Sequence, residues 1–309
     1  MSGLSSVVRS SLLLVILAAH GCPGVPPTLA VDARSFTDDL QRTVQVPAVP
    51  ARVISLAPSV TEMLFAIGLD REIVAVTPFC DYPPEAARRP KVGYAQPSLE
   101  QIVALDPDMV IAPAEFLRSD LLGKLEQLNI SALVLSARSL RDIERHLLLL
   151  GLVFKRSEQA GRVINAMRHR TEVAANRAGE FRPVRVLYVL NSRPLITIGP
   201  GSYIHELIEL AGGINSAASA GTAYPRIDME TVLRSDPEVL LFPVGTTETV
   251  PAADRDAWKG WTDITAVRTG RLHTISSDII NRPGPRIVEA LEAMVRIFHP
   301  DSDDPRTSP

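Results

Sequence analysis

The sequence predicts an α/β protein with two lobes, each built on a mostly parallel sheet, joined by one long helix. Two observations predict this architecture. Strands and helices alternate on both sides of a charged central segment, and one unit occurs twice. PSLEQIVALDPDMVIAP at 97–113 and RIDMETVLRSDPEVLLFP at 226–243 both read as helix, Asp-Pro, apolar strand and Pro. Alternation of this kind gives parallel sheets with helices on both faces, and ligands favour the carboxyl ends of their strands.

The first lobe is expected over residues 51–154. Val53 to Leu56 is a short run rich in β-branched residues and predicts a strand. Ser59 and Glu62 have the spacing of a capping box at the start of the following helix, which Gly68 closes. The other elements expected here are strands at 73–76, 109–111 and 132–136 and helices at 120–129 and 139–154, besides the helix of the repeated unit.

Residues 155–180 are expected to form the linker helix. This segment is charged, has no proline and lacks a dense apolar face, so a largely solvated helix is predicted. The second lobe, 181–299, repeats the pattern of the first. Its expected elements are strands at 185–190 and 270–275, helices at 199–213 and 285–298, and the second copy of the repeated unit. Residues 34–50 are expected to be a lead-in and 300–309 a tail.

The N-terminal residues 1–33 are predicted to be an export segment. One cation, Arg9, precedes an apolar core at 12–19 that is too short to span a bilayer. Gly21-Cys22 resembles the end of a bacterial lipoprotein signal, in which Cys22 would receive lipid. The alternative is cleavage after Ala30 or Ala33. The mature chain is thus expected in the periplasm or at the cell surface.

Composition narrows the function classes. The chain has 309 residues, a net charge of −3 and no run of Lys or Arg, so nothing indicates nucleic-acid binding. Only two cysteines are present, so a disulfide framework is not expected to stabilise the fold. The six histidines have no zinc-site spacing, and His146 and His169 are expected on exposed helices.

Each copy of the repeated unit carries a glutamate in the first helical turn, Glu100 and Glu230. The structural explanation is a favourable interaction with the helix dipole. The matched positions also predict one carboxylate per lobe on a common rim, where the pair would dock on two basic sites of a symmetric partner.

A tyrosine stands six residues before each glutamate: Tyr94 and Tyr224. Tyrosine offers a flat face and a polar tip, so two of them at the edge between the lobes would hold a broad flat ligand. Alternatively, each is a half-buried loop aromatic.

Four further residues are candidates for ligand contact. Cys80, in the loop after a predicted strand, would ligate a metal centre, and its alternative role is that of a buried small hydrophobe. Asp278, Asn281 and Arg282 follow the last predicted strand, where they would bond amide or carboxylate groups of a ligand. The alternative is a loop held by its own hydrogen bonds.

These motifs carry a resemblance to a known family. RVISLAPSVTEMLFAIG, DYPPEA, PSLEQIVALDPDMVIA and NRPGPRIVEALE look like bacterial ABC-transporter substrate-binding proteins for cobalamin, ferric siderophores and haem. The resemblance covers roughly residues 51–298. It implies two Rossmann-like lobes joined by one rigid helix and a ligand cleft between them. It also implies that a glutamate on each lobe, here Glu100 and Glu230, binds arginines of a dimeric permease that works with its ATPase.

Within the family the sequence is most similar to the cobalamin-binding branch, chiefly through FCDYPPEA and PSLEQIVAL. The resemblance implies that Phe79, Tyr94 and Tyr224 flank the corrin. The departure is that Tyr94 and Tyr224 stand where well-known cobalamin binders have tryptophan. Haem binders of the family use a tyrosine near Tyr94 as iron ligand, so haem or a ferric siderophore stays an alternative, and phenolate ligation of haem iron is chemically sound.

The alternative from another class is a hydrolase or reductase on the same architecture, and it is not expected. The chain has no G-x-S-x-G elbow, and GPGSYI lacks the lysine of a P-loop. No nucleophile, base and orienting group suggest themselves together. No cofactor is expected beyond the transported ligand, and a sensor without transport remains a further alternative.

Overall fold

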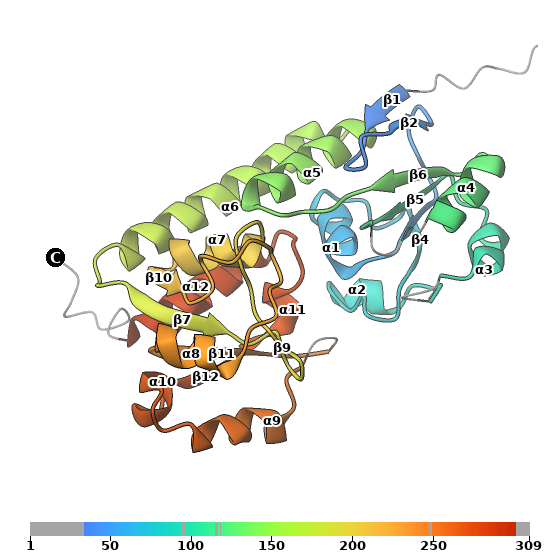
Figure 1. The fold of residues 1–309 in the computed structure, drawn as a ribbon. Coiled ribbons are helices and arrows are strands. Elements are labelled where there is room, and N and C mark those ends of the chain that lie inside the picture. Colours follow the sequence, from blue (N-terminus) through green and yellow to red (C-terminus); the bar gives the residue numbers. More distant parts are fainter. Residues whose placement is uncertain (1–33, 94–96, 115–116, 118, 247–248, 301–309) are drawn as a thin grey trace, which may run out of the picture.

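The computed structural model describes residues 34–93, 97–114, 117, 119–246 and 249–300. Two four-stranded parallel sheets form two lobes, and a long helix runs along both of them (Figure 1). The first sheet has the order β4-β3-β5-β6 and the second the order β10-β7-β11-β12. In both, the second strand in the chain lies at one edge, followed by the first, third and fourth. The shared order confirms the predicted fold class and agrees with the duplication seen in the sequence.

The strands of the first sheet are almost wholly buried, which requires helices on both faces. The apolar runs predicted as strands form here because side chains on both faces leave water. Its strands are β3 (Val53–Ser55), β4 (Ile73–Val76), β5 (Met109–Ala112) and β6 (Ser131–Val134), and its helices are α1 (Pro58–Ala66), α2 (Pro84–Ala87), α3 (Leu99–Ala104), α4 (Ser119–Gln127) and α5 (Leu140–Val153).

The second sheet is buried in its central strands, and a short two-stranded ribbon of β8 and β9 is added to its lobe. Its strands are β7 (Val184–Tyr188), β10 (Gly213–Asn215), β11 (Val239–Val244) and β12 (Leu272–Ser276), with β8 (Asn191–Ser192) and β9 (Leu195–Ile196) in the ribbon. Its helices are α7 (Tyr203–Leu210), α8 (Met229–Ser235), α9 (Ala252–Ala257), α10 (Thr265–Arg268), α11 (Ser277–Ile280) and α12 (Ile287–Phe298), with a short 3₁₀ turn, η1 (Trp258–Gly260).

The linker helix α6 (Ser157–Ala178) forms as predicted, and most of its residues are exposed or half-buried, in agreement with the expected solvated character. It packs against α5, α12 and α1 and buries one stripe of mostly small apolar side chains. Close packing with α5 depends on Gly151, because a Cβ there would lie 2.8 Å from the Cβ of Ala160. Because most of the buried residues are small, they form no dense apolar pattern in the sequence, and the buried stripe was not predicted for that reason.

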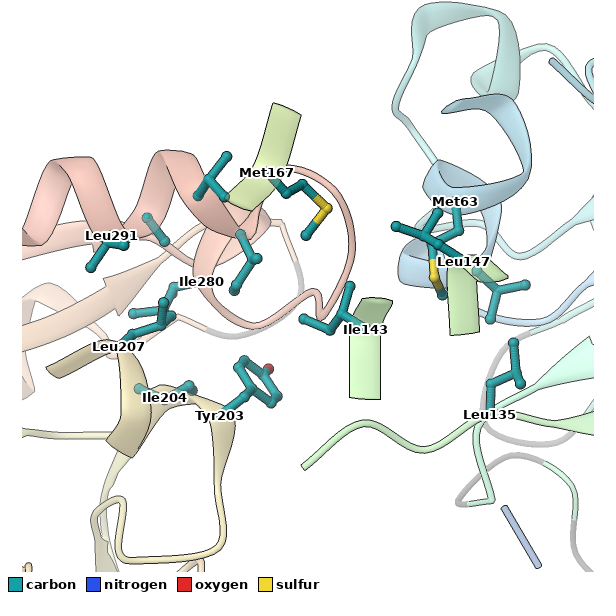
Figure 2. Close-up of a cluster of buried hydrophobic side chains, with 14 of the residues drawn as sticks. Met63, Leu135, Ile143, Leu147, Met167, Tyr203, Ile204, Leu207, Ile280 and Leu291 are labelled. Atoms are coloured by element: carbon teal, nitrogen blue, oxygen red, sulfur yellow. The ribbon is translucent and has the colours of Figure 1, made fainter. Parts of the chain in front are cut away.

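One apolar cluster continues from the first lobe into the second (Figure 2). It joins Met63 of α1, Ile143 of α5, Met167 of α6 and Tyr203 of α7. A hydrogen bond also crosses between the lobes, because the backbone N–H of Leu140 donates to the Glu206 carboxylate at 2.8 Å. The lobes therefore share a core along α5 and α6.

The lead-in forms an antiparallel hairpin of β1 (Arg34–Thr37) and β2 (Thr43–Val46), which packs near β6. Its turn carries Asp39, whose carboxylate lies 2.6 Å from His146 Nε2 and accepts a 2.6 Å hydrogen bond from Arg145. His146 is buried, so the expectation of an exposed histidine is wrong, whereas His169 is exposed. Within the described residues, no helix has the length and apolar character needed to cross a membrane.

Candidate functional site

The two copies of the repeated unit build matching helix starts. Ser98 caps α3 by accepting a hydrogen bond from the N–H of Gln101, and Asp228 caps α8 by accepting one from Thr231. Glu100 and Glu230 lie two residues after these caps, in the first turn, and both are exposed. Glu230 also pairs with Arg234 one turn later at 2.7 Å. Each lobe thus presents one carboxylate to solvent from the same place in its repeated unit.

The two lobes meet at the carboxyl ends of their strands. The loop after β4 carries Asp81, and the segment after β12 carries Asp278 and Arg282. Arg282 donates to Asp81 across the lobes at 2.6 Å and to Asp278 within its own lobe at 2.6 Å. Thr246, which follows β11, interacts with both aspartates. We call this set of contacts the strand-end interface.

Arg282 is the centre of the strand-end interface, and its side chain is only 4% exposed. Burial alone would raise the pKa of Asp81, but the hydrogen bonds and charge of Arg282 outweigh it and lower that pKa. The prediction that Asp278 and Arg282 lie at the edge between the lobes agrees with this position. Their polar groups are engaged with each other and with Asp81, which the sequence did not indicate.

A second inter-lobe ion pair lies beside the first. Arg286 donates through Nε and Nη2 to the two oxygens of Glu62 at 2.9 and 2.6 Å, and Arg282 approaches the same carboxylate at 3.5 Å. Burial raises the pKa of Glu62 against the lowering effect of both guanidinium groups. The expected capping box of Ser59 and Glu62 is wrong, since α1 begins at Pro58 without a side-chain cap. Glu62 turns instead to the other lobe.

The loop that carries Tyr224 is fixed by backbone hydrogen bonds on both sides of the tyrosine. Gly199 N–H donates to Ala223 at 2.9 Å, and Thr197 N–H donates to Pro225 at 3.1 Å. Tyr224 itself is 54% exposed, so this aromatic group stands on an anchored segment with its side chain open to solvent. Tyr94 lies outside the described residues, as does Cys22.

Gly199 is needed for this anchoring. A Cβ at that position would lie 2.2 Å from the carbonyl oxygen of Thr222, which no real contact allows. Any larger residue would therefore displace the loop that carries Tyr224.

The other residues predicted to contact the ligand, Phe79, Cys80 and Asn281, differ in how deeply they are buried. Phe79 is half-buried in the loop after β4. Cys80 is buried, its sulfur lies 3.1 Å from the hydroxyls of Thr61 and Thr77, and burial raises the pKa of its thiol. This position favours the structural role over ligand contact. Asn281 accepts a hydrogen bond from the Tyr188 hydroxyl at 2.8 Å, which ties it to the sheet.

Sequence reasoning missed Asp81, Glu62 and Arg286. Each lies within a motif that was quoted for other reasons, but their pairing spans more than 200 residues of chain. The sequence does contain one indication of a buried ion pair: a charged residue within an apolar helix pattern, as Glu62 is in SVTEMLF. Among the described residues, no three His, Cys, Asp or Glu side chains converge as a metal site.

Comparison with known proteins finds relatives that are named for vitamin B12 binding. The vitamin B12-binding protein of Vibrio cholerae is 30% identical over 243 residues, covering 78% of this chain and 86% of the relative. The crystal structure of periplasmic vitamin B12 binding protein BtuF of Vibrio cholerae matches with a TM-score of 0.70 and 28% identity, covering 82% of this chain and 99% of that one.

Two other relatives have names that do not mention vitamin B12. A periplasmic haem binding protein from Pseudomonas aeruginosa has a TM-score of 0.73 and 26% identity, covering 82% of this chain and 94% of that structure. The uncharacterized ABC transporter substrate-binding lipoprotein YvrC of Bacillus subtilis is 25% identical, covering 96% of this chain and 97% of the relative. The family model described as periplasmic binding protein matches residues 53–279. The two lobes match each other and meet at the ends of their strands. Together with the matching family model and these relatives, this arrangement shows that the chain belongs to the periplasmic binding protein family.

Proposed function

We propose that the protein is the extracytoplasmic solute-binding component of an ABC importer, and that it captures a corrinoid between its lobes. The observation that carries the proposal is the strand-end interface, where Asp81 and Arg282 bring the carboxyl ends of both sheets together. Ligands of open α/β sheets bind at this edge. The names of the Vibrio cholerae relatives support vitamin B12 as the ligand.

The proposed contacts are aromatic and polar. Phe79, Tyr94 and Tyr224 would pack on the corrin, since aromatic side chains give broad contact at low entropic cost. Asp278 and Arg282 would exchange part of their pairing with Asp81 for hydrogen bonds to amide groups of the ligand. Such an exchange keeps the buried guanidinium paired throughout, and leaving it unpaired would be costly.

Haem is the second candidate ligand. The tyrosines at 94 and 224 favour it, because a phenolate is an established axial ligand of haem iron. The Pseudomonas aeruginosa relative, which is named a haem binding protein, supports the same alternative. A ferric siderophore is the third candidate.

Delivery would use the two exposed carboxylates. Glu100 and Glu230 would dock on basic sites of a dimeric permease that works with its ATPase, with one carboxylate from each lobe. The family consists of binding proteins, so we assign no catalysis. The lipoprotein relative from Bacillus subtilis supports export and a lipid on Cys22 as the means of attachment.

Separate titrations with cyanocobalamin and haemin, followed by absorbance and calorimetry, test the ligand. We expect saturable 1:1 binding of cyanocobalamin that weakens when Tyr224 is replaced by Ala. If haemin binds instead, Tyr94→Phe should change its Soret band, which identifies phenolate ligation. Binding of neither compound would refute both assignments and leave a ferric siderophore to be tested. Uptake assays with the permease present distinguish a transport protein from a sensor, because only a transport protein supports uptake of the ligand.

A further inference from the structure

Each of the two exposed glutamates has an exposed aliphatic residue beside it. Val103 follows Glu100 by three positions in α3, and Leu233 follows Glu230 by three positions in α8. Residues three apart in a helix are neighbours on its surface. Val103 is 41% exposed and Leu233 is 39% exposed. The two aliphatic side chains therefore occupy the same place in the two copies of the repeated unit, one in each lobe (Figure 1).

The core of each lobe does not account for these two side chains. The residues that precede them, Ile102 and Val232, are fully buried and anchor the two helices to their lobes. One exposed aliphatic residue is ordinary on a protein surface. The same exposure at the same position of both copies, one turn after a carboxylate, is explained by contact with a partner, because apolar groups leave water when two surfaces dock.

The two carboxylates differ in their surroundings. Arg234 lies 2.7 Å from Glu230, whereas Ala104 occupies the matching position after Glu100. The side chains of Arg234 and Glu230 are 70% and 80% exposed, so their pair is solvated. The cation nevertheless offsets part of the negative potential that a basic partner would meet at this place. The attraction of a basic partner should therefore be stronger at the first lobe than at the second.

We propose that the docking surface of each lobe combines a carboxylate with the aliphatic side chain one turn later. The first lobe would use Glu100 with Val103, and the second Glu230 with Leu233. The partner is a permease surface that presents, at two equivalent places, a cationic side chain next to an apolar depression. The charges set the rate of association, which Arg234 lowers, and the aliphatic contacts slow dissociation. This inference rests on the docking role proposed above for the two glutamates.

Biolayer interferometry tests the aliphatic part of the surface. The full chain is titrated against the permease–ATPase complex of the same organism, held in nanodiscs, at several salt concentrations. Val103→Ser combined with Leu233→Ser should weaken binding about tenfold through faster dissociation, with the salt dependence unchanged. The matched control is Leu148→Ser combined with Val173→Ser, which replaces exposed aliphatic residues of α5 and α6 outside the repeated unit and should bind as the wild type does.

A second pair of variants tests the charge. Arg234→Ala should raise the association rate constant about twofold or more at low salt, and the gain should disappear at high salt because exposed charges are then screened. Arg162→Ala is the matched control, since Arg162 pairs with Glu158 at the same spacing of four positions in α6. Circular dichroism of each variant verifies that the fold is retained.

The outcomes separate this inference from the proposed function. Unchanged dissociation without Val103 and Leu233, together with slower association when Glu100 and Glu230 are both alanine, would overturn the inference and leave the docking role intact. No binding of the wild type, or unchanged association without the two carboxylates, would refute both. Unchanged or slower association of Arg234→Ala would overturn the part assigned to Arg234.

Discussion

Replacing Glu62 by Gln tests whether the ion pairs between the lobes stabilise the fold. The Glu62 side chain is 2% exposed, and Arg286, its main partner, is 16% exposed. Removing one partner of a buried pair costs about 3–5 kcal/mol, because the other charge is left without compensation. Arg282 keeps Asp81 and Asp278, and Gln can still accept one hydrogen bond. We therefore expect the low end of that range, about 3 kcal/mol.

Thermal unfolding followed by calorimetry measures this loss. For a chain of this size each kcal/mol lowers Tm by roughly 2–4 °C, so Glu62→Gln should lower it by roughly 6–12 °C. Glu144→Gln is the control, because Glu144 pairs with the exposed Arg168, and no resolvable change is expected. The double variant with Arg286→Met should be more stable than the sum of the single effects predicts. Equal Tm values for the Glu62→Gln variant and the control would refute the reasoning.

Three further outcomes are expected. Burial raises the pKa of Asp39, but its hydrogen bonds and cationic neighbours outweigh burial and hold that pKa below its ordinary value. The stability it contributes is therefore present above about pH 4 and lost as pH falls further; urea unfolding at pH 5 and pH 3 should show a smaller loss for Asp39→Asn than for the wild type. Gly199→Ala should weaken cyanocobalamin binding at least tenfold by displacing Tyr224, with secondary structure unchanged by circular dichroism; unchanged affinity contradicts the assigned role. Alanine at both Glu100 and Glu230 should abolish uptake and leave ligand affinity intact, whereas a fall in affinity would place these carboxylates in the binding site.

Local patterns in the sequence predicted most of the fold. Short runs rich in β-branched residues form buried strands, and both helices of the repeated unit form, with Ser98 and Asp228 as their caps. The same sheet order in both lobes agrees with the duplication of 97–113 at 226–243. These features depend on residues close together in the chain, so a single sequence contains them.

The rest depends on contacts between distant segments. Glu62 and Arg286 are separated by 224 positions, and no local pattern pairs them. The burial of His146 was not predicted, because the carboxylate that pairs with it belongs to Asp39 in the hairpin, 107 residues away. No local pattern indicates that contact. The buried stripe of α6 was missed because small side chains such as Ala160 and Ala174 give a weak apolar pattern and become buried only when neighbouring helices approach closely.

The apolar cluster that runs through both lobes limits how a bound molecule is unloaded. Swinging the lobes apart about α6 would bring Ile143, Met167, Tyr203 and Ile204 into water, at about 1.5–3 kcal/mol for each large side chain. The sum, roughly 6–12 kcal/mol, is comparable to the whole binding free energy of a micromolar ligand, about 8 kcal/mol. Release of the ligand at the membrane should therefore proceed by displacement of the loop at 77–83 and of the segment at 277–286, which includes α11, while the paired helices α5 and α6 stay in place.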